Sequence, residues 1–156
     1  MLMKVEQIYK EFTGYMENCK GKDCSNPCCF FASEKGVDVY PDEVIYFAKK
    51  FGKNFPAKII RSKDSETGFK MFGCLDDYCL LANEKPIVCR GFPIKPFSLE
   101  SGHQKIQISE NCPMHNELSQ SYVKKSYGLW GKVYSDRFRN SFVKKWIASY
   151  YLKKLS

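Results

Sequence analysis

Eight cysteines constrain this chain more than any other feature, because their order limits how the backbone can fold around them. Four fall within eleven residues as Cys-x4-Cys-x3-Cys-Cys, three follow as Cys-x4-Cys-x9-Cys, and the last precedes a proline. They are Cys19, Cys24, Cys28, Cys29, Cys74, Cys79, Cys89 and Cys112. Short spacers let two sulfurs reach one ion, and thiolate is a favoured ligand of zinc and of iron–sulfur centres. The sequence therefore predicts a metal site, as two four-ligand centres or one centre with spare thiols.

Disulfides and buried thiols are the two other interpretations of these cysteines. Disulfides persist in oxidising compartments, whereas Lys4, Glu6 and Lys10 place charges where a secretory signal would be apolar. The chain also has no run of about 18 apolar residues that could span a bilayer. We therefore expect a cytoplasmic protein with reduced thiols and no membrane partner. The clustering of the cysteines favours metal ligation over scattered buried thiols.

The spacing leaves the identity of the metal open. The chain has no Cys-x2-Cys pair, so it lacks the usual zinc-finger spacing. The segment from Cys19 to Cys28 is one residue longer than the plant-type ferredoxin pattern, and Cys112-Pro113 is similar to the Cys-Pro of other cluster motifs. Zinc, iron and an iron–sulfur cluster all remain candidates for the cofactor.

The length of 156 residues and the 44% hydrophobic content indicate one folded domain over residues 1–156. Apolar residues at spacings of three and four predict a helix over about 2–18. A second helix is expected to begin at Pro41 and to end at Gly52, because proline suits the first helical position and glycine the end.

Two hairpins are predicted between these helices and the C-terminal segment. One pairs about 57–62 with 68–73 across a polar loop, and the other pairs about 95–100 with 104–109. The expected fold class is α+β, mainly helical, with short hairpins and irregular cysteine-rich loops around a metal centre.

Residues 115–156 are predicted to form a basic, aromatic, helical segment. A helix starting near His115 is expected to end around Gly128 and Gly131, and Ser135 is expected to cap a final helix. Of the net charge of +8, residues 117–156 carry +7, from nine Lys or Arg against Glu117 and Asp136.

The aromatic residues of this segment recur at multiples of four. They are Tyr122, Trp130, Tyr134, Phe138, Phe142, Trp146 and Tyr150. Aromatics at helical spacing usually belong to a core. Together with the basic residues they could also form a stacking platform for single-stranded nucleic acid or contact an acidic protein. A third explanation of the charge is that a basic helix offsets a negative metal–thiolate centre.

The cysteine order resembles the CxxCxxCC, or YkgJ-like, family of zinc- or iron-chelating domains over residues 19–113. The matching segments are Cys28-Cys29, then Pro41-Asp42-Glu43, Gly73-Cys74 with Cys79, Lys85-Pro86-Ile87-Val88-Cys89-Arg90-Gly91-Phe92-Pro93, and Cys112-Pro113. Three departures are Lys85 where the family has arginine, Leu80-Leu81 where it has Ile-Tyr, and a wider first cysteine group. The resemblance implies a metal-chelating domain whose biochemical role is undefined.

One branch of this family, the flagellin lysine N-methylases, implies an alternative: an iron–sulfur enzyme acting with S-adenosylmethionine. The radical-type Cys-x3-Cys-x2-Cys motif is absent, since Phe31 stands where the third cysteine would be. In that alternative Arg90 would belong to the cofactor or substrate site. A second alternative is a zinc-stabilised nucleic-acid-binding module.

Several polar side chains near the cysteines are candidates for a role in the site. Arg90 could donate to a metal-bound sulfur or to an anionic group, or else pair with an acid. His115 lies three residues after Cys112, within reach of a shared ion, but helix-start histidines are commoner. Asp76 and Asp77 are expected to be solvated turn residues.

Overall fold

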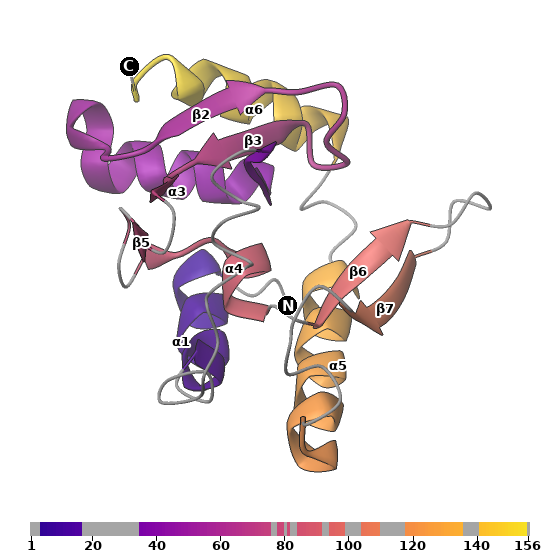
Figure 1. Cartoon of the computed structure of the whole chain (residues 1–156). Helices are drawn as coiled ribbons and strands as arrows, with labels where there is room; N and C mark the ends of the chain where they lie inside the picture. The colour runs from indigo at the N-terminus through magenta and orange to yellow at the C-terminus, as the bar shows by residue number, and fades with distance from the viewer. Residues whose placement is uncertain are drawn as a thin grey trace.

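The computed structural model of the chain describes most of the sequence outside the first cysteine group. The described residues are 4–16, 35–75, 78–79, 81, 84–91, 94–98, 104–109, 118–135 and 141–155. Within them the fold is α+β and mostly helical, as the sequence predicts, with five α-helices and a three-stranded antiparallel sheet (Figure 1).

The three-stranded sheet has the order β1-β3-β2, all antiparallel. Its strands are β1 (Val37–Val39), β2 (Lys58–Arg61) and β3 (Phe69–Phe72). The pairing of β2 with β3 confirms the first predicted hairpin, with Ile59 opposite Met71. Phe69 and Met71 are both buried on the central strand, because alternate residues of a strand share a face and here that face meets helices.

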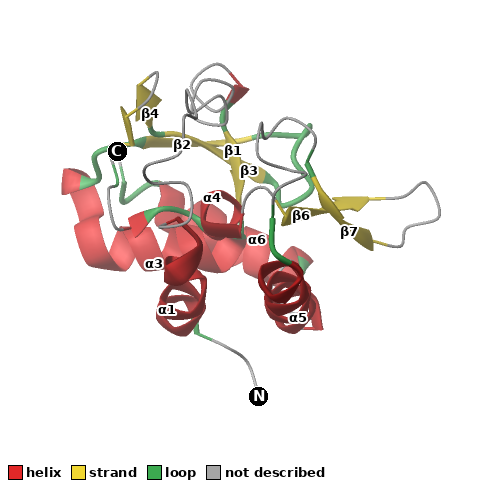
Figure 2. Ribbon diagram, turned by 60° about the horizontal axis from the view of Figure 1, so that its bottom comes forward, coloured by secondary structure: helices red, strands yellow, loops and turns green. Residues whose placement is uncertain are grey.

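Helices α3 (Pro41–Phe51) and α6 (Phe142–Leu152) lie against one side of this sheet (Figure 2). The predicted start and end of α3 are confirmed: Pro41 occupies the first helical position, and Gly52 ends the helix with a φ of 54°. Val44 and Phe47 of α3 are fully buried, so they form the centre of the core between helix and sheet.

A second group of elements packs on the N-terminal helix α1 (Val5–Met16), which confirms the helix predicted over about 2–18. It contains the short helix α4 (Ile87–Gly91), the long helix α5 (Gln120–Ser135) and the hairpin of β6 (Ile94–Ser98) with β7 (Gln104–Ile108). That hairpin confirms the second predicted pairing. A further two-residue hairpin joins β4 (Cys74–Leu75) to β5 (Tyr78–Cys79), which the sequence did not predict. A short 3₁₀ turn over Gly52–Asn54 follows α3.

Trp130 of α5 holds this second group together. Its side chain is fully buried, its Nε1–H donates to the carbonyl of Ile94 at 2.7 Å, and its ring centroid lies 5.3 Å from that of Phe12. Gly91 of α4 lies directly against the indole ring. One side chain of α5 therefore contacts α1, α4 and β6, and for Trp130 the interpretation as a core residue is confirmed.

Two predictions for the C-terminal segment are wrong. Helix α5 runs through Gly128 and Gly131 and ends at Ser135, which therefore does not cap the final helix. Ser141 caps α6 instead, with its Oγ accepting from the backbone N–H of Lys144 at 3.2 Å. Both glycines are exposed and have no neighbouring atom within 4 Å of an added Cβ, so packing neither requires nor forbids them there. The helix start expected near His115 lies outside the described residues.

Among the described residues no helix combines the length and the apolar character needed to cross a membrane.

The glycines of α4 and α5 give a matched pair of substitutions with opposite expected effects. A Cβ on Gly91 would lie 2.5 Å from Cζ2 of the buried Trp130, so Gly91→Ala should lower the free energy of unfolding by about 1–3 kcal/mol. Gly128→Ala should raise it by about 0.5–1 kcal/mol, because alanine loses less entropy in an exposed helix. Urea unfolding followed by circular dichroism measures both, and an unchanged stability of Gly91→Ala would contradict the packing described.

Candidate functional site

The β4–β5 hairpin brings two of the predicted metal ligands into register. Cys74 and Cys79 are directly paired across the two antiparallel strands, and Leu75 pairs with Tyr78. Residues opposed in this way generally have Cβ atoms about 4.5–5.5 Å apart and share one face of the ladder. The backbone therefore brings together two cysteines that are separated by four residues in the sequence. Gly73, which is buried, links this hairpin directly to β3 of the central sheet.

Cys89 is a half-buried residue of α4, a helix of only five residues. So short a helix has little stability of its own, and its position depends on contacts with other elements. Pro86 precedes its first residue, as expected for a chain entering a helix. Its first residue, Ile87, is fully buried, and its backbone N–H is bound by a side chain from α3.

That side chain is Glu43, whose carboxylate is completely buried. One oxygen, Oε1, accepts from the Tyr9 hydroxyl at 2.8 Å and from the Ile87 N–H at 2.7 Å. The other, Oε2, accepts from the backbone N–H of Tyr40 at 2.8 Å, at the start of α3. A single carboxylate therefore connects α1, α3 and α4.

Burial raises the pKa of Glu43 to about 7, against the opposing effect of the donors at Tyr40, Ile87 and Tyr9, which stabilise the charged form. The pKa of Tyr9 is raised well above its usual value, first by burial and then by the adjacent carboxylate. No structural role was assigned to Glu43 from the sequence. The one signal of a larger role was its place in the Pro41-Asp42-Glu43 segment of the family resemblance.

Arg90 is 5% exposed and joins α4 to α1. Its Nε donates to the carbonyl of Lys85, its Nη1 donates to the carbonyl of Tyr9 at 3.1 Å, and its guanidinium lies 4.0 Å from the centre of the Tyr9 ring. Burial lowers the pKa of the guanidinium, and the nearby Tyr9, Glu84 and Glu43 oppose that effect. Arg90 therefore has a structural role that neither sequence interpretation included, while its contact with a cofactor or a metal-bound sulfur stays a prediction.

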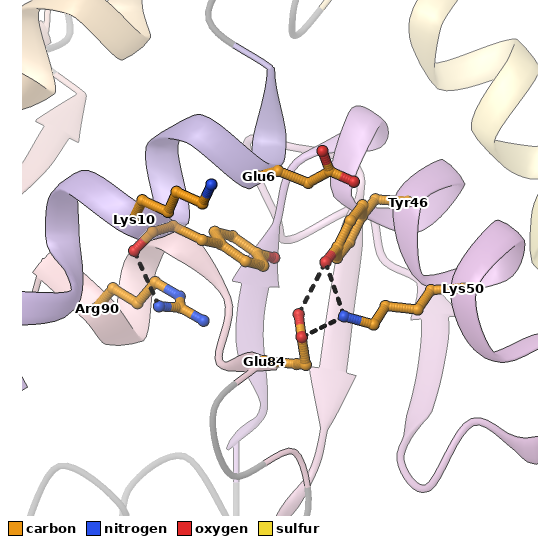
Figure 3. Close-up of a pocket in the computed structure, with 7 residues that line it drawn as sticks. Glu6, Lys10, Tyr46, Lys50, Glu84 and Arg90 are labelled. Atoms are coloured by element: carbon orange, nitrogen blue, oxygen red, sulfur yellow. Dashed lines mark hydrogen bonds and ion pairs between the residues drawn. The ribbon is translucent and has the colours of Figure 1, made fainter.

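A hollow of about 370 Å³ lies beside Arg90, between α1, α3 and the segment before α4 (Figure 3). Its walls are formed by Glu6, Tyr9, Lys10, Tyr46, Lys50, Glu84 and Arg90. Glu84 forms an ion pair with Lys50 and accepts from the Tyr46 hydroxyl at 2.9 Å. The hydrogen bond to Glu84 raises the pKa of Lys50, and burial raises that of Tyr46. The lining is mixed in charge, and its central acid is already bound by two groups of the protein.

Five of the eight cysteines predicted to bind metal are not among the described residues. Cys19, Cys24, Cys28, Cys29 and Cys112 lie outside the described residues, together with His115, Asp76 and Asp77. Within the part of the chain that is described, no group of three or more His, Cys, Asp or Glu side chains is placed to hold a metal ion. The described candidate site thus consists of the Cys74–Cys79 register and Cys89 on its anchored helix.

Comparison with known proteins adds no relative from which the role of this site could be taken. No family model matches the chain, and neither the curated proteins nor the solved structures contain a significant match.

Replacing Glu43 tests whether the buried carboxylate supports the fold. Glu43→Gln turns one acceptor oxygen into an NH₂ donor that faces an N–H or O–H group, so we expect a loss of about 2–4 kcal/mol in the free energy of unfolding. Glu6→Gln, on the exposed surface of α1, is the matched control and should change stability by less than about 0.5 kcal/mol. Equal stabilities for the two variants in urea unfolding would contradict the role assigned to Glu43.

The raised pKa of Glu43 also predicts a pH dependence of stability with a definite sign. The folded state holds the Glu43 proton up to about pH 7, whereas the unfolded chain releases it near pH 4.5. Its stabilising contribution is therefore complete below about 4.5 and is lost as the pH rises through about 7, at no more than about 1.4 kcal/mol per pH unit. The difference in unfolding free energy between the native chain and Glu43→Gln should shrink from pH 5 to pH 7.5. A difference that stays constant over this range would show that Glu43 is ionised in the fold throughout it.

Proposed function

We propose that this protein is a metal-binding protein that chelates zinc or iron through its clustered cysteines, with an iron–sulfur cluster as one form of the iron-bound state. The observation that carries the proposal is the register of the β4–β5 hairpin, in which Cys74 lies directly opposite Cys79. A backbone register that brings two cysteines together suits the tetrahedral site of zinc and equally an iron of a cluster, because both take thiolate ligands.

The surroundings of Cys89 supply independent support. A metal ligand must be held in position by the residues around it, or the site loses affinity. Cys89 lies between Ile87, whose N–H is bound by Glu43, and Arg90, which binds two backbone carbonyls. Buried charged groups are expensive to maintain, so their use to position a five-residue helix favours a precise role for that helix. Ligation of a metal by Cys89 would provide that role.

The remaining support comes from the sequence. The complete order of the eight cysteines resembles a family of zinc- or iron-chelating domains, with Cys89-Arg90-Gly91-Phe92-Pro93 as its most specific segment. In this proposal Cys19, Cys24, Cys28, Cys29 and Cys112 complete the ligand set, as one centre or as two. The bound metal would join backbone segments that are far apart in the sequence, and structural zinc sites contribute about 10–16 kcal/mol in small domains.

Metal analysis of protein purified without oxygen tests this function. We expect stoichiometric zinc or iron, and iron in a cluster would add broad visible absorption. Replacing both Cys74 and Cys79 by serine should lower the metal content by at least about half, because two thiolates of one centre are lost. A metal chelator should also lower the melting temperature of the native chain.

The matched control is Leu75→Ala, which alters the same hairpin and leaves every sulfur in place, so its metal content should equal that of the native chain. Chain recovered without metal, folded and with eight reduced thiols, would disprove the proposal. A cross-strand disulfide would give a different pattern, in which a reductant lowers the melting temperature and a chelator does not.

A further inference from the structure

The C-terminal helix α6 presents an exposed apolar strip that the metal site does not explain. The strip consists of Phe142, Val143, Trp146 and Tyr150, whose exposed fractions are 83%, 49%, 70% and 60%. Its three aromatic residues are spaced by four, so they follow one another along one side of the helix at a rise of about 6 Å. The aromatic segment that we expected to form core is therefore core at Trp130 and surface at these three positions, which corrects that interpretation for α6.

The opposite side of α6 explains why this side stays exposed. Ala148 is fully buried where α6 packs against α3, and the helix also contacts β2. Figure 1 shows α6 beside α3 and the sheet, with α5 elsewhere in the molecule. The α6 strip thus faces away from the only core that the helix touches in the described structure. Exposed patches of this kind on a folded protein usually mark a binding surface.

Cations gather at the C-terminal end of the α6 strip. The Nζ of Lys154 lies 5.2 Å from the ring centres of both Tyr150 and Tyr151, and the Nζ of Lys49, from α3, lies 5.6 Å from that of Tyr151. Lys153 is exposed beside them. Two separate elements therefore contribute positive charge to one end of an aromatic surface.

Acidic residues do not offset this charge within residues 141–155, which contain four lysines and no Asp or Glu. The turn that carries Asp64 and Glu66 does approach α6, because the Nζ of Lys145 donates to the carbonyl of Glu66 at 3.2 Å. Lys145 is half-buried and is not part of the strip. Its contact with the turn leaves the rings of Phe142, Trp146 and Tyr150 exposed. The α6 strip is thus aromatic along its length and cationic at its end.

We propose that the α6 strip binds single-stranded nucleic acid, with bases stacked on Phe142, Trp146 and Tyr150 and phosphates held by Lys49, Lys153 and Lys154. Exposed rings beside a positive groove or patch are the surface that sequence-tolerant single-strand binders use, because every base has a π-face and every nucleotide a charge. A second copy of this chain fits less well, since residues 141–155 contain four lysines and no Asp or Glu, so a second α6 strip offers these lysines no counter-charge.

Fluorescence anisotropy of the full chain with a labelled oligouridylate of about twenty nucleotides tests this inference. The substitutions Trp146→Ala and Tyr150→Ala together should weaken binding about tenfold or more, because each exposed ring supports one stacked base. Lys153→Gln with Lys154→Gln should weaken binding and reduce the slope of log affinity against log salt by about one to two. Trp146 is exposed whereas Trp130 is buried, so bound oligonucleotide should quench the tryptophan fluorescence of the native chain. The Trp146→Ala variant, which keeps only Trp130, should not show this quenching.

Helix α5 supplies the matched controls. Tyr127→Ala removes an exposed aromatic outside the strip, and Lys124→Gln with Lys125→Gln removes two exposed lysines, so each should leave the affinity within about twofold of the native value. Equal weakening by the controls and the α6 variants would overturn the proposal, and so would native protein that does not bind the oligonucleotide at about 50 mM salt. Self-association, or partition onto phosphatidylserine vesicles, without oligonucleotide binding would assign the strip to another partner. Metal content measured on every variant separates this result from that of the proposed metal site.

Discussion

The carboxyl group of Glu43 is removed from water at the junction of three helices, where a buried polar group is expensive unless each oxygen finds a hydrogen-bond partner. The donors come from Tyr9 of α1, from the start of α3 itself and from the first residue of α4. Satisfying one buried group therefore determines how three elements meet. The guanidinium of Arg90 reinforces the same junction by binding the Tyr9 carbonyl and stacking on its ring.

This junction connects the stable framework to the candidate metal ligands. Helix α4 is too short to persist alone. It is held by Glu43, which accepts from the N–H of Ile87, and by Arg90, which donates to the carbonyls of Lys85 and Tyr9, and Cys89 lies between these two anchors. The β4–β5 hairpin is attached to the central sheet through Gly73. If metal binds as proposed, its binding energy adds to that of the hydrophobic core.

The C-terminal helices illustrate how position in the fold separates residues of one type. Trp130 and Trp146 share an aromatic repeat of four residues, but Trp130 is fully buried among α1, α4 and β6, whereas Trp146 is 70% exposed. Helix α6 buries the side that contains Ala148 against α3, which leaves its aromatic side in solvent. A pattern of aromatics at helical spacing thus marks one side of a helix without indicating whether that side meets a core or a partner.

The sequence alone determined the elements whose signals are local. Pro41 and Gly52 mark the ends of α3, apolar spacing defines α1, and alternation with polar turns defines the β2–β3 and β6–β7 hairpins, because each depends on residues close together in the chain. The clustering and order of the cysteines predicted which residues could bind metal. Only the tertiary structure decided that Glu43 and Arg90 anchor α4, that Cys74 opposes Cys79, and that the α6 strip is exposed. These features depend on contacts between distant segments, and burial and pairing arise only when those segments are packed together.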